Sequence, residues 1–116
     1  MMRTVACLLL GAAGLALSVT SALAYDWTIS NASNWAIHEV YISPCGNRYW
    51  GQDRLGSSAI MRSGDSYVLH NVGGGCYDVK LVDEDGDVCV INRVNIGGDE
   101  EWEVTNQNLL KCEGNH

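Results

Sequence analysis

Basic side chains are scarce in this chain, which has 7 Lys and Arg residues against 14 Asp and Glu and a formal net charge of −7. Proteins bind nucleic acids and anionic membrane surfaces through Lys and Arg. The acidic balance therefore argues against both kinds of partner, whereas it favours solubility and permits a cationic ligand.

Several signatures of catalysis and of metal binding are also missing. No C-x2-C pair suggests a zinc site, and no Gly-x-Ser-x-Gly motif suggests a nucleophile elbow. Gly73-Gly74-Gly75 is followed by no lysine or helix start, so it does not resemble a phosphate loop. His38 and His70 each lie in a predicted strand without a second ligand at a useful spacing. We therefore expect a protein that is not an enzyme.

The first 24 residues have the pattern of an export signal. Arg3 precedes an apolar run over 5–19, and Ala22-Leu23-Ala24 has the small-x-small pattern that signal peptidase recognises. The run is shorter than the roughly 20 residues that span a membrane. We expect cleavage after Ala24 and a single secreted or periplasmic domain, 25–116, with 92 residues, a net charge of −8 and no membrane span.

Hydrophobic periodicity predicts strands throughout this domain. Runs of period two, rich in aromatic and β-branched residues, predict about seven short strands, and no amphipathic helix of convincing length is evident. The segment 106–112 is expected to be a turn or an edge segment with Leu109 and Leu110 buried. The fold class predicted is all-β, a small disulfide-stapled antiparallel β-sandwich. The strands are expected at 25–30, 35–42, 59–62, 66–70, in the two arms of the 76–94 hairpin, and at 100–105.

Asp85-Gly86 predicts a tight two-residue turn within the 76–94 hairpin. In that register Val82 faces Cys89, and Cys76 faces Asn95. Cys89 and Ile91 then point away from the core, and the core face carries Tyr77, Val79, Leu81, Val88, Val90 and Val94.

Four cysteines remain after cleavage, and an even number in a short exported domain predicts two disulfides. The hairpin register separates Cys76 from Cys89 by about 20 Å, far beyond the roughly 7 Å between Cα atoms that a disulfide requires. Two pairings are left. We favour Cys45–Cys76 with Cys89–Cys112 over Cys45–Cys89 with Cys76–Cys112.

Short motifs across most of the mature chain resemble those of a group of small exported bacterial proteins of uncharacterised function. The resemblance implies export and a β fold, and it supplies no catalytic residue. The residues that carry it are Tyr41-Ile42-Ser43-Pro44, Trp50-Gly51, Leu55-Gly56, Ser63-Gly64, Cys76-Tyr77-Asp78-Val79 and Asp85-Gly86.

The long irregular stretch 45–58 is the best candidate for a binding surface, because long loops in small domains are often functional. Aromatic side chains beside polar groups are common where proteins bind sugars or other proteins. The alternative is that Trp50 folds back to cover one end of the sandwich. Trp27 and Trp102 are expected in the core. The candidate ligand-binding residues are Arg48, Tyr49, Trp50, Asp53 and Arg54.

The acidic turn offers a second candidate, because hard cations such as Ca²⁺ favour carboxylate oxygens. Asp83, Asp85 and Asp87 are the candidate metal ligands, although their spacing is not that of an EF-hand. The alternative is a solvated hairpin turn. No other cofactor is expected. Asn31-Ala32-Ser33 also fits the glycosylation sequon.

These observations predict a secreted or periplasmic, non-enzymatic β-domain that binds a protein, a glycan or another envelope component. Two alternatives stay open. One is a calcium-binding module that uses the 83–87 turn. The other is a small enzyme that uses His38 and His70.

Overall fold

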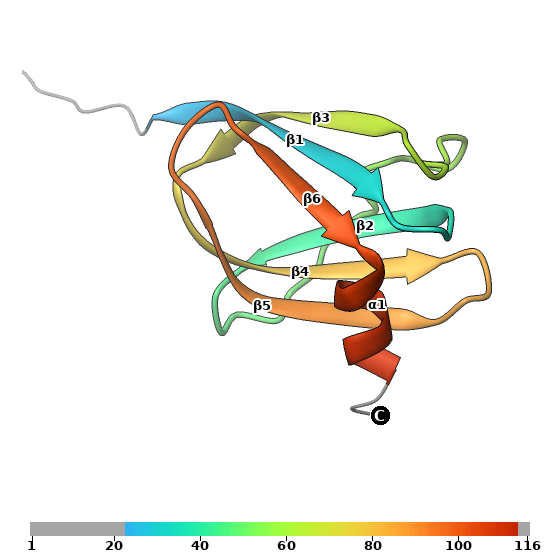
Figure 1. Ribbon diagram of the computed structural model, residues 1–116. Coiled ribbons are helices and arrows are strands. Elements are labelled where there is room, and N and C mark those ends of the chain that lie inside the picture. Colours follow the sequence, from blue (N-terminus) through green and yellow to red (C-terminus); the bar gives the residue numbers. More distant parts are fainter. Residues whose placement is uncertain (1–22, 114–116) are drawn as a thin grey trace, which may run out of the picture.

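The computed structural model describes residues 23–113 and contains six strands and one helix (Figure 1). The expected export signal lies outside the described residues, except for Leu23 and Ala24. No described helix is long and apolar enough to cross a membrane. The elements in chain order are β1 (Ala24–Ala32), β2 (Ile37–Pro44), β3 (Ser66–Gly73), β4 (Gly75–Asp83), β5 (Val88–Ile96), β6 (Glu101–Thr105) and α1 (Asn106–Glu113).

The strands form two three-stranded sheets, one with the order β3-β1-β6 and the other with the order β2-β4-β5. Figure 1 shows the two sheets as separate layers, with α1 leading from the end of β6 toward β5. The expected two-sheet β structure is confirmed, with six strands instead of about seven. The sandwich is not wholly antiparallel, because β6 pairs parallel to β1. The connection from β5 crosses between the sheets and brings β6 alongside β1, where Thr28 donates a backbone hydrogen bond to Glu100 (2.9 Å).

Apolar side chains from both sheets fill the space between them. Trp27 is 1% exposed and stacks on Trp102, with the ring centroids 5.4 Å apart. Trp27 is therefore a core residue as expected, whereas Trp102 is only partly buried against the core. Other core side chains come from each of the six strands, from the β2–β3 connection and from α1; they include Ile29, Val40, Leu55, Leu69, Val79, Leu81, Val94, Val104 and Leu109.

The β4–β5 hairpin has a longer turn than the expected two-residue turn. Asp83 donates a backbone hydrogen bond to Asp87, and Gly86 donates one to Asp83, both at 3.0 Å. This is a three-residue loop with Gly86 in the left-handed conformation (φ 82°). Leu81 therefore pairs with Cys89, one residue away from the predicted register.

The one-residue shift reverses the faces of β5 near the turn. Cys89 is buried, whereas Val88 and Val90 are 42% and 36% exposed, so the predicted core positions there are wrong. A β-bulge, with Arg93 at φ 63°, then restores the predicted pairing of Cys76 with Asn95.

Both disulfides have the favoured pairing. Cys45 is bonded to Cys76 with 5.4 Å between Cα atoms, and Cys89 to Cys112 with 5.2 Å. Two disulfides in one small domain indicate an oxidising compartment outside the cytoplasm.

The segment 59–62 is not a strand, because it makes only an isolated bridge between Met61 and Ile37. The side chain of Asn31 helps to shape this region. Its Nδ2 donates to the carbonyls of Trp35 (2.8 Å) and Met61 (2.9 Å). Because Asn31 is 0% exposed, the sequon is inaccessible in the folded domain.

The segment expected as a turn or edge is the helix α1. Thr105 begins it as a cap, since its Oγ1 accepts from the backbone N–H of Asn108, and Asn108 Oδ1 accepts from the backbone N–H of Thr105 (2.8 Å). This reciprocal arrangement is a capping box with Asn in place of Glu or Gln. Leu109 is buried as expected, whereas Leu110 is 51% exposed.

Candidate functional site

The connection between β2 and β3, residues 45–65, is fixed along the free edge of β2. Asp53 Oδ1 accepts backbone hydrogen bonds from Val40 (2.9 Å) and Leu55 (3.0 Å), and Arg54 donates its backbone N–H to Val40. Leu55 is buried in the core, and the disulfide of Cys45 anchors the start of the connection. Asp53 therefore holds the loop in place with one oxygen, whatever else it binds.

A lysine and two aromatic rings meet where this loop lies against the sheet. Tyr41 on β2 pairs with Lys80 on β4. The Lys80 ammonium lies 4.4 Å from the centroid of the Tyr41 ring and 5.3 Å from that of Trp50. Both distances are within the range of a cation–π interaction. We call Tyr41, Trp50 and Lys80 the aromatic–lysine cluster.

Two carboxylates, those of Glu39 and Asp53, lie close enough to Tyr41 to affect its hydroxyl. Its hydroxyl donates a hydrogen bond of 2.6 Å to Glu39 Oε1. This hydrogen bond, partial burial and the negative charges of Glu39 and Asp53 raise the pKa of Tyr41 from 10.0 to about 12. Tyr41 thus remains a neutral hydrogen-bond donor at any physiological pH, and the cluster joins a cationic side to an acidic side.

Two shallow hollows adjoin at the aromatic–lysine cluster. Tyr49, Trp50 and Gln52 line the first, together with Arg48. Tyr41, Glu39 and Asp53 line the second, and Gln52 borders both hollows. Tyr49 is 78% exposed, whereas Trp50 is partly buried beside Lys80.

The structure brings most of the predicted ligand-binding residues to this surface. Arg48 and Tyr49 are exposed neighbours of Trp50, and Asp53 lies in the second hollow. Arg54 is exposed, and its backbone is bound to β2. Sequence reasoning missed Glu39, Tyr41 and Lys80, because only the pairing of β2 with β4 brings them beside the loop. The predicted second strand contained Glu39 and Tyr41, but no local signal indicated its partner.

The acidic turn does bring its three aspartates together. One carboxylate oxygen from each of Asp83, Asp85 and Asp87 lies within 4.8 Å of the others. Asp83 is buried, however, and its Oδ1 accepts the backbone N–H groups of Asp85 (2.9 Å) and Asp87 (3.0 Å). Glu84 Oε1 likewise accepts the backbone N–H of Ala36 (2.7 Å). Of the four acidic residues in 83–87, Asp83 and Glu84 therefore help to hold the turn in its conformation.

The two histidines lie on different sheets. His70 on β3 contacts Asp26 on β1, with 3.0 Å between Nδ1 and Oδ1, and both side chains are exposed. His38 on β2 is partly buried and lines the second hollow. Because His70 and His38 line different hollows, the two imidazoles do not form one acid–base site.

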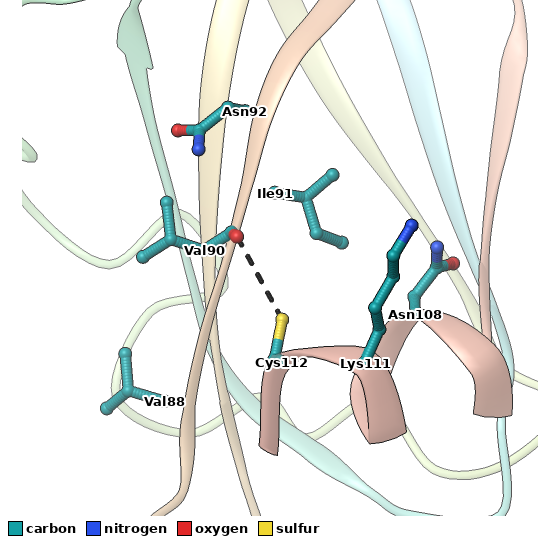
Figure 2. Close-up of a pocket in the computed structure, with 7 residues that line it drawn as sticks. All are labelled: Val88, Val90, Ile91, Asn92, Asn108, Lys111 and Cys112. Atoms are coloured by element: carbon teal, nitrogen blue, oxygen red, sulfur yellow. Dashed lines mark hydrogen bonds between the residues drawn. The ribbon is translucent and has the colours of Figure 1, made fainter. Parts of the chain in front are cut away.

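A third hollow, of about 650 Å³, lies between β5 and α1 (Figure 2). Its lining includes the exposed edges of Val88 and Val90 and the side chains of Asn108 and Lys111 from the helix. Figure 2 shows Cys112 directed at Val90, with 3.9 Å between Sγ and the carbonyl oxygen. The disulfided helix therefore lies against β5, an outer strand of its sheet, and covers part of an edge that could otherwise pair with another chain.

The described residues thus offer one surface with the aromatic and polar groups of a binding site, and it is centred on the aromatic–lysine cluster. No protein-family model, no curated protein and no solved structure matches the chain, so this surface carries the functional argument alone.

Proposed function

We propose that this protein is a non-enzymatic, extracytoplasmic binding domain that holds a protein, a glycan or another envelope component on the surface around the aromatic–lysine cluster. The observation that carries the proposal is the position of Lys80 between the rings of Tyr41 and Trp50, beside the exposed Tyr49. Aromatic side chains with polar partners supply much of the affinity at binding surfaces. A loop held by a disulfide and by Asp53 presents them in a fixed arrangement, which lowers the entropic cost of binding.

The arrangement of ionisable groups supports binding over catalysis. General acid–base chemistry requires a titratable group within hydrogen-bond reach of the reacting atoms and a partner placed for the second proton transfer. In residues 23–113 the two histidines are on separate sheets, and all four described cysteines are in disulfides.

Capture from the protein's own envelope extract tests the proposal. We expect the wild-type domain to retain a component that Tyr49→Ala and Trp50→Ala retain at least several-fold less. Leu110→Ala removes another exposed large side chain, from α1, and serves as the control. Each variant is first compared with the wild type by thermal unfolding. If Trp50→Ala unfolds the domain, then Tyr49→Ala decides, since its side chain is 78% exposed. Equal capture by all the folded variants would contradict the proposal.

Calcium binding by the 83–87 turn is a second candidate, favoured by the 4.8 Å grouping of its carboxylates. A calcium ion requires six to eight oxygens, and the turn already uses one oxygen of Asp83 twice. Addition of millimolar Ca²⁺ should raise the thermal midpoint if the site is real, because a ligand that binds only the folded state stabilises it. An unchanged midpoint rejects this candidate.

A further inference from the structure

The Lys80 ammonium is held by aromatic faces and not by an opposite charge. In residues 23–113 the only side-chain ion pair within 4.0 Å joins His70 to Asp26. Lys80 therefore has no carboxylate partner, although acidic residues outnumber basic ones two to one in the chain. Aromatic rings attract a cation without neutralising its charge. The two rings thus position the ammonium without neutralising it, and because Lys80 is only partly buried, an anionic group of a ligand can pair with it.

Arg48 places a second cation on the same surface. It lines the first hollow with Tyr49 and Trp50, and its backbone has a φ of 65°, which is uncommon for a residue other than glycine. Asn47 Oδ1 accepts the backbone N–H of Tyr49 (3.2 Å) and supports this turn. Strained backbone of this kind is often retained where it presents a functional group.

The neighbouring groups restrict the kind of anion that fits. Gln52 borders both hollows, and Glu39 and Asp53 line the second. Carboxylates accept hydrogen bonds from hydroxyl groups, but they repel a small dianion such as free phosphate. The ligand should therefore combine a single negative charge with several hydroxyls and with a flat apolar face for Tyr49 and Trp50. A pyranose that carries a carboxylate meets all three requirements.

We propose that this surface binds carboxylated saccharides, with the carboxylate paired to Lys80 and Arg48 and the sugar ring stacked on Tyr49 and Trp50. The inference rests on the proposed function and names its ligand class. The hydroxyls of the sugar then donate to Gln52 and to the acidic side of the second hollow. Lys80 and Arg48 give the preference for an acidic sugar, whereas Tyr49 and Trp50 supply affinity for any sugar.

A matched pair of probes tests the charge. The wild-type domain is titrated calorimetrically with oligogalacturonides and with their methyl esters, which keep the sugar and remove the charge. A glycan array with uronate-containing, sialylated and neutral oligosaccharides extends the comparison to other carboxylated sugars. We expect at least about tenfold tighter binding of carboxylated ligands than of their neutral counterparts, the effect of one charge-assisted hydrogen bond.

Variants separate the effect of the cations from the effect of the aromatic rings. Lys80→Gln should lower the preference for the acid several-fold and keep the weaker binding of the ester, whereas Lys80→Arg should retain the preference. Lys80→Gln with Arg48→Gln should remove the preference. Trp50→Ala should weaken the binding of both ligands. Lys111→Gln removes a cation from α1, in the hollow beside β5, and should change the affinity for neither the acid nor the ester. The thermal midpoint of each variant shows that it is folded.

The possible failures are distinguishable. Equal affinity of the wild type for acid and ester overturns the inference and leaves the binding function intact. A preference that Lys80→Gln with Arg48→Gln leaves unchanged has the same consequence. Binding to no carboxylated glycan, together with Trp50-dependent capture of an envelope protein, overturns the inference in favour of a protein partner. Loss of both glycan binding and envelope capture removes the proposed function as well.

Discussion

Buried polar side chains in this domain differ in how fully they are satisfied. The side chain of Asn31 makes four hydrogen bonds, because its Oδ1 also accepts from the backbone N–H (3.0 Å) and the hydroxyl (2.6 Å) of Ser33. Ser43 Oγ is buried without a hydrogen-bond partner among the described residues. The first side chain fixes the turn before β2, and the second makes no comparable contribution.

Asn31→Ala should therefore be strongly destabilising. The substitution leaves the buried N–H of Ser33 without its acceptor and opens a small cavity, so we expect the free energy of unfolding to fall by about 3 kcal/mol. Urea titration followed by tryptophan fluorescence measures this loss. Ser43→Ala is the matched control, since it removes a hydroxyl that is not hydrogen-bonded, and its stability should stay within about 0.5 kcal/mol of the wild type or rise. Similar losses for both variants would contradict this account of the Asn31 network.

The raised pKa of Tyr41 predicts a loss of stability at alkaline pH. The folded state holds the phenolic proton more tightly than the unfolded state, so the stabilisation is fully present below pH 10.0 and is lost as the pH rises toward about 12. Glu39→Gln removes the carboxylate that accepts the hydrogen bond of Tyr41, and it should lower the pKa of Tyr41 toward its ordinary value. Spectroscopic titration of tyrosinate absorbance measures the change, with Tyr41→Phe identifying the group. A titration curve that Glu39→Gln does not move would refute the assignment.

At the scale of single elements, the sequence predicted the strand-forming segments better than their ends and partners. The predicted segments overlap all six strands, and only 59–62 is not one of them. The predicted position of Cys76 opposite Asn95 excluded a Cys76–Cys89 disulfide, and the favoured one of the two remaining pairings is the one observed. The same Asp85-Gly86 signal fits both a two-residue and a three-residue turn, so the register near the turn was wrong by one. The bulge at Arg93 has no distinct local signal, because its φ of 63° is imposed by the sheet and not by the residue type.

The hairpin turn offers a direct test of its observed form. Gly86 has a φ of 82°, and a Cβ added there meets no atom within 4 Å, so Gly86→Ala should cost only backbone strain, about 1 kcal/mol. Gly98→Ala is the matched control, because its Cβ also meets no atom within 4 Å and its backbone is not left-handed. Chemical denaturation of both variants measures the difference. Equal stability of the two variants would indicate that the turn does not require positive φ at Gly86.

The candidate site shows the same division between local and long-range signals. The polar residues around Tyr49 and Trp50 in the sequence indicate a binding surface, with a Trp50 that folds back onto the sandwich as the alternative. In the structure Tyr49 is exposed and Trp50 is partly buried. Lys80 is 30 positions from Trp50, and only the pairing of β2 with β4, together with the loop along the edge of β2, places its ammonium 5.3 Å from that ring. Neither segment carries a sequence pattern that indicates this tertiary pairing. Sequence reasoning could therefore identify Tyr49 and Trp50 but not Lys80.

At the scale of the whole molecule, two covalent links support a core of modest size. The Cys45–Cys76 link closes a separation of 31 residues and the Cys89–Cys112 link one of 23. Loop-closure entropy gives such links about 4 and 3 kcal/mol respectively. A domain of this length has a total stability of about 5–14 kcal/mol, so the links supply a large share of it. Each also fastens a distinct part: the first anchors the loop of the candidate site, and the second holds α1 against β5.

Reduction should consequently destabilise the domain more than any single substitution described above. We expect complete reduction to lower the thermal midpoint by tens of degrees, since a loss of 1 kcal/mol lowers it by about 4–8 °C in a domain of this size.

The two disulfides should differ in their effect on binding. Cys45→Ser/Cys76→Ser should weaken glycan or envelope binding along with stability, because the loop loses its anchor. Cys89→Ser/Cys112→Ser should lower stability and leave binding unchanged at temperatures where the domain is folded. Calorimetry with a count of free thiols measures the fall of the thermal midpoint, and titration with the carboxylated probe measures the change in binding. A midpoint unchanged after full reduction would mean that the core stabilises the fold without the disulfides. Equal binding by both double variants would mean that Asp53 and Leu55 hold the loop without the Cys45–Cys76 disulfide.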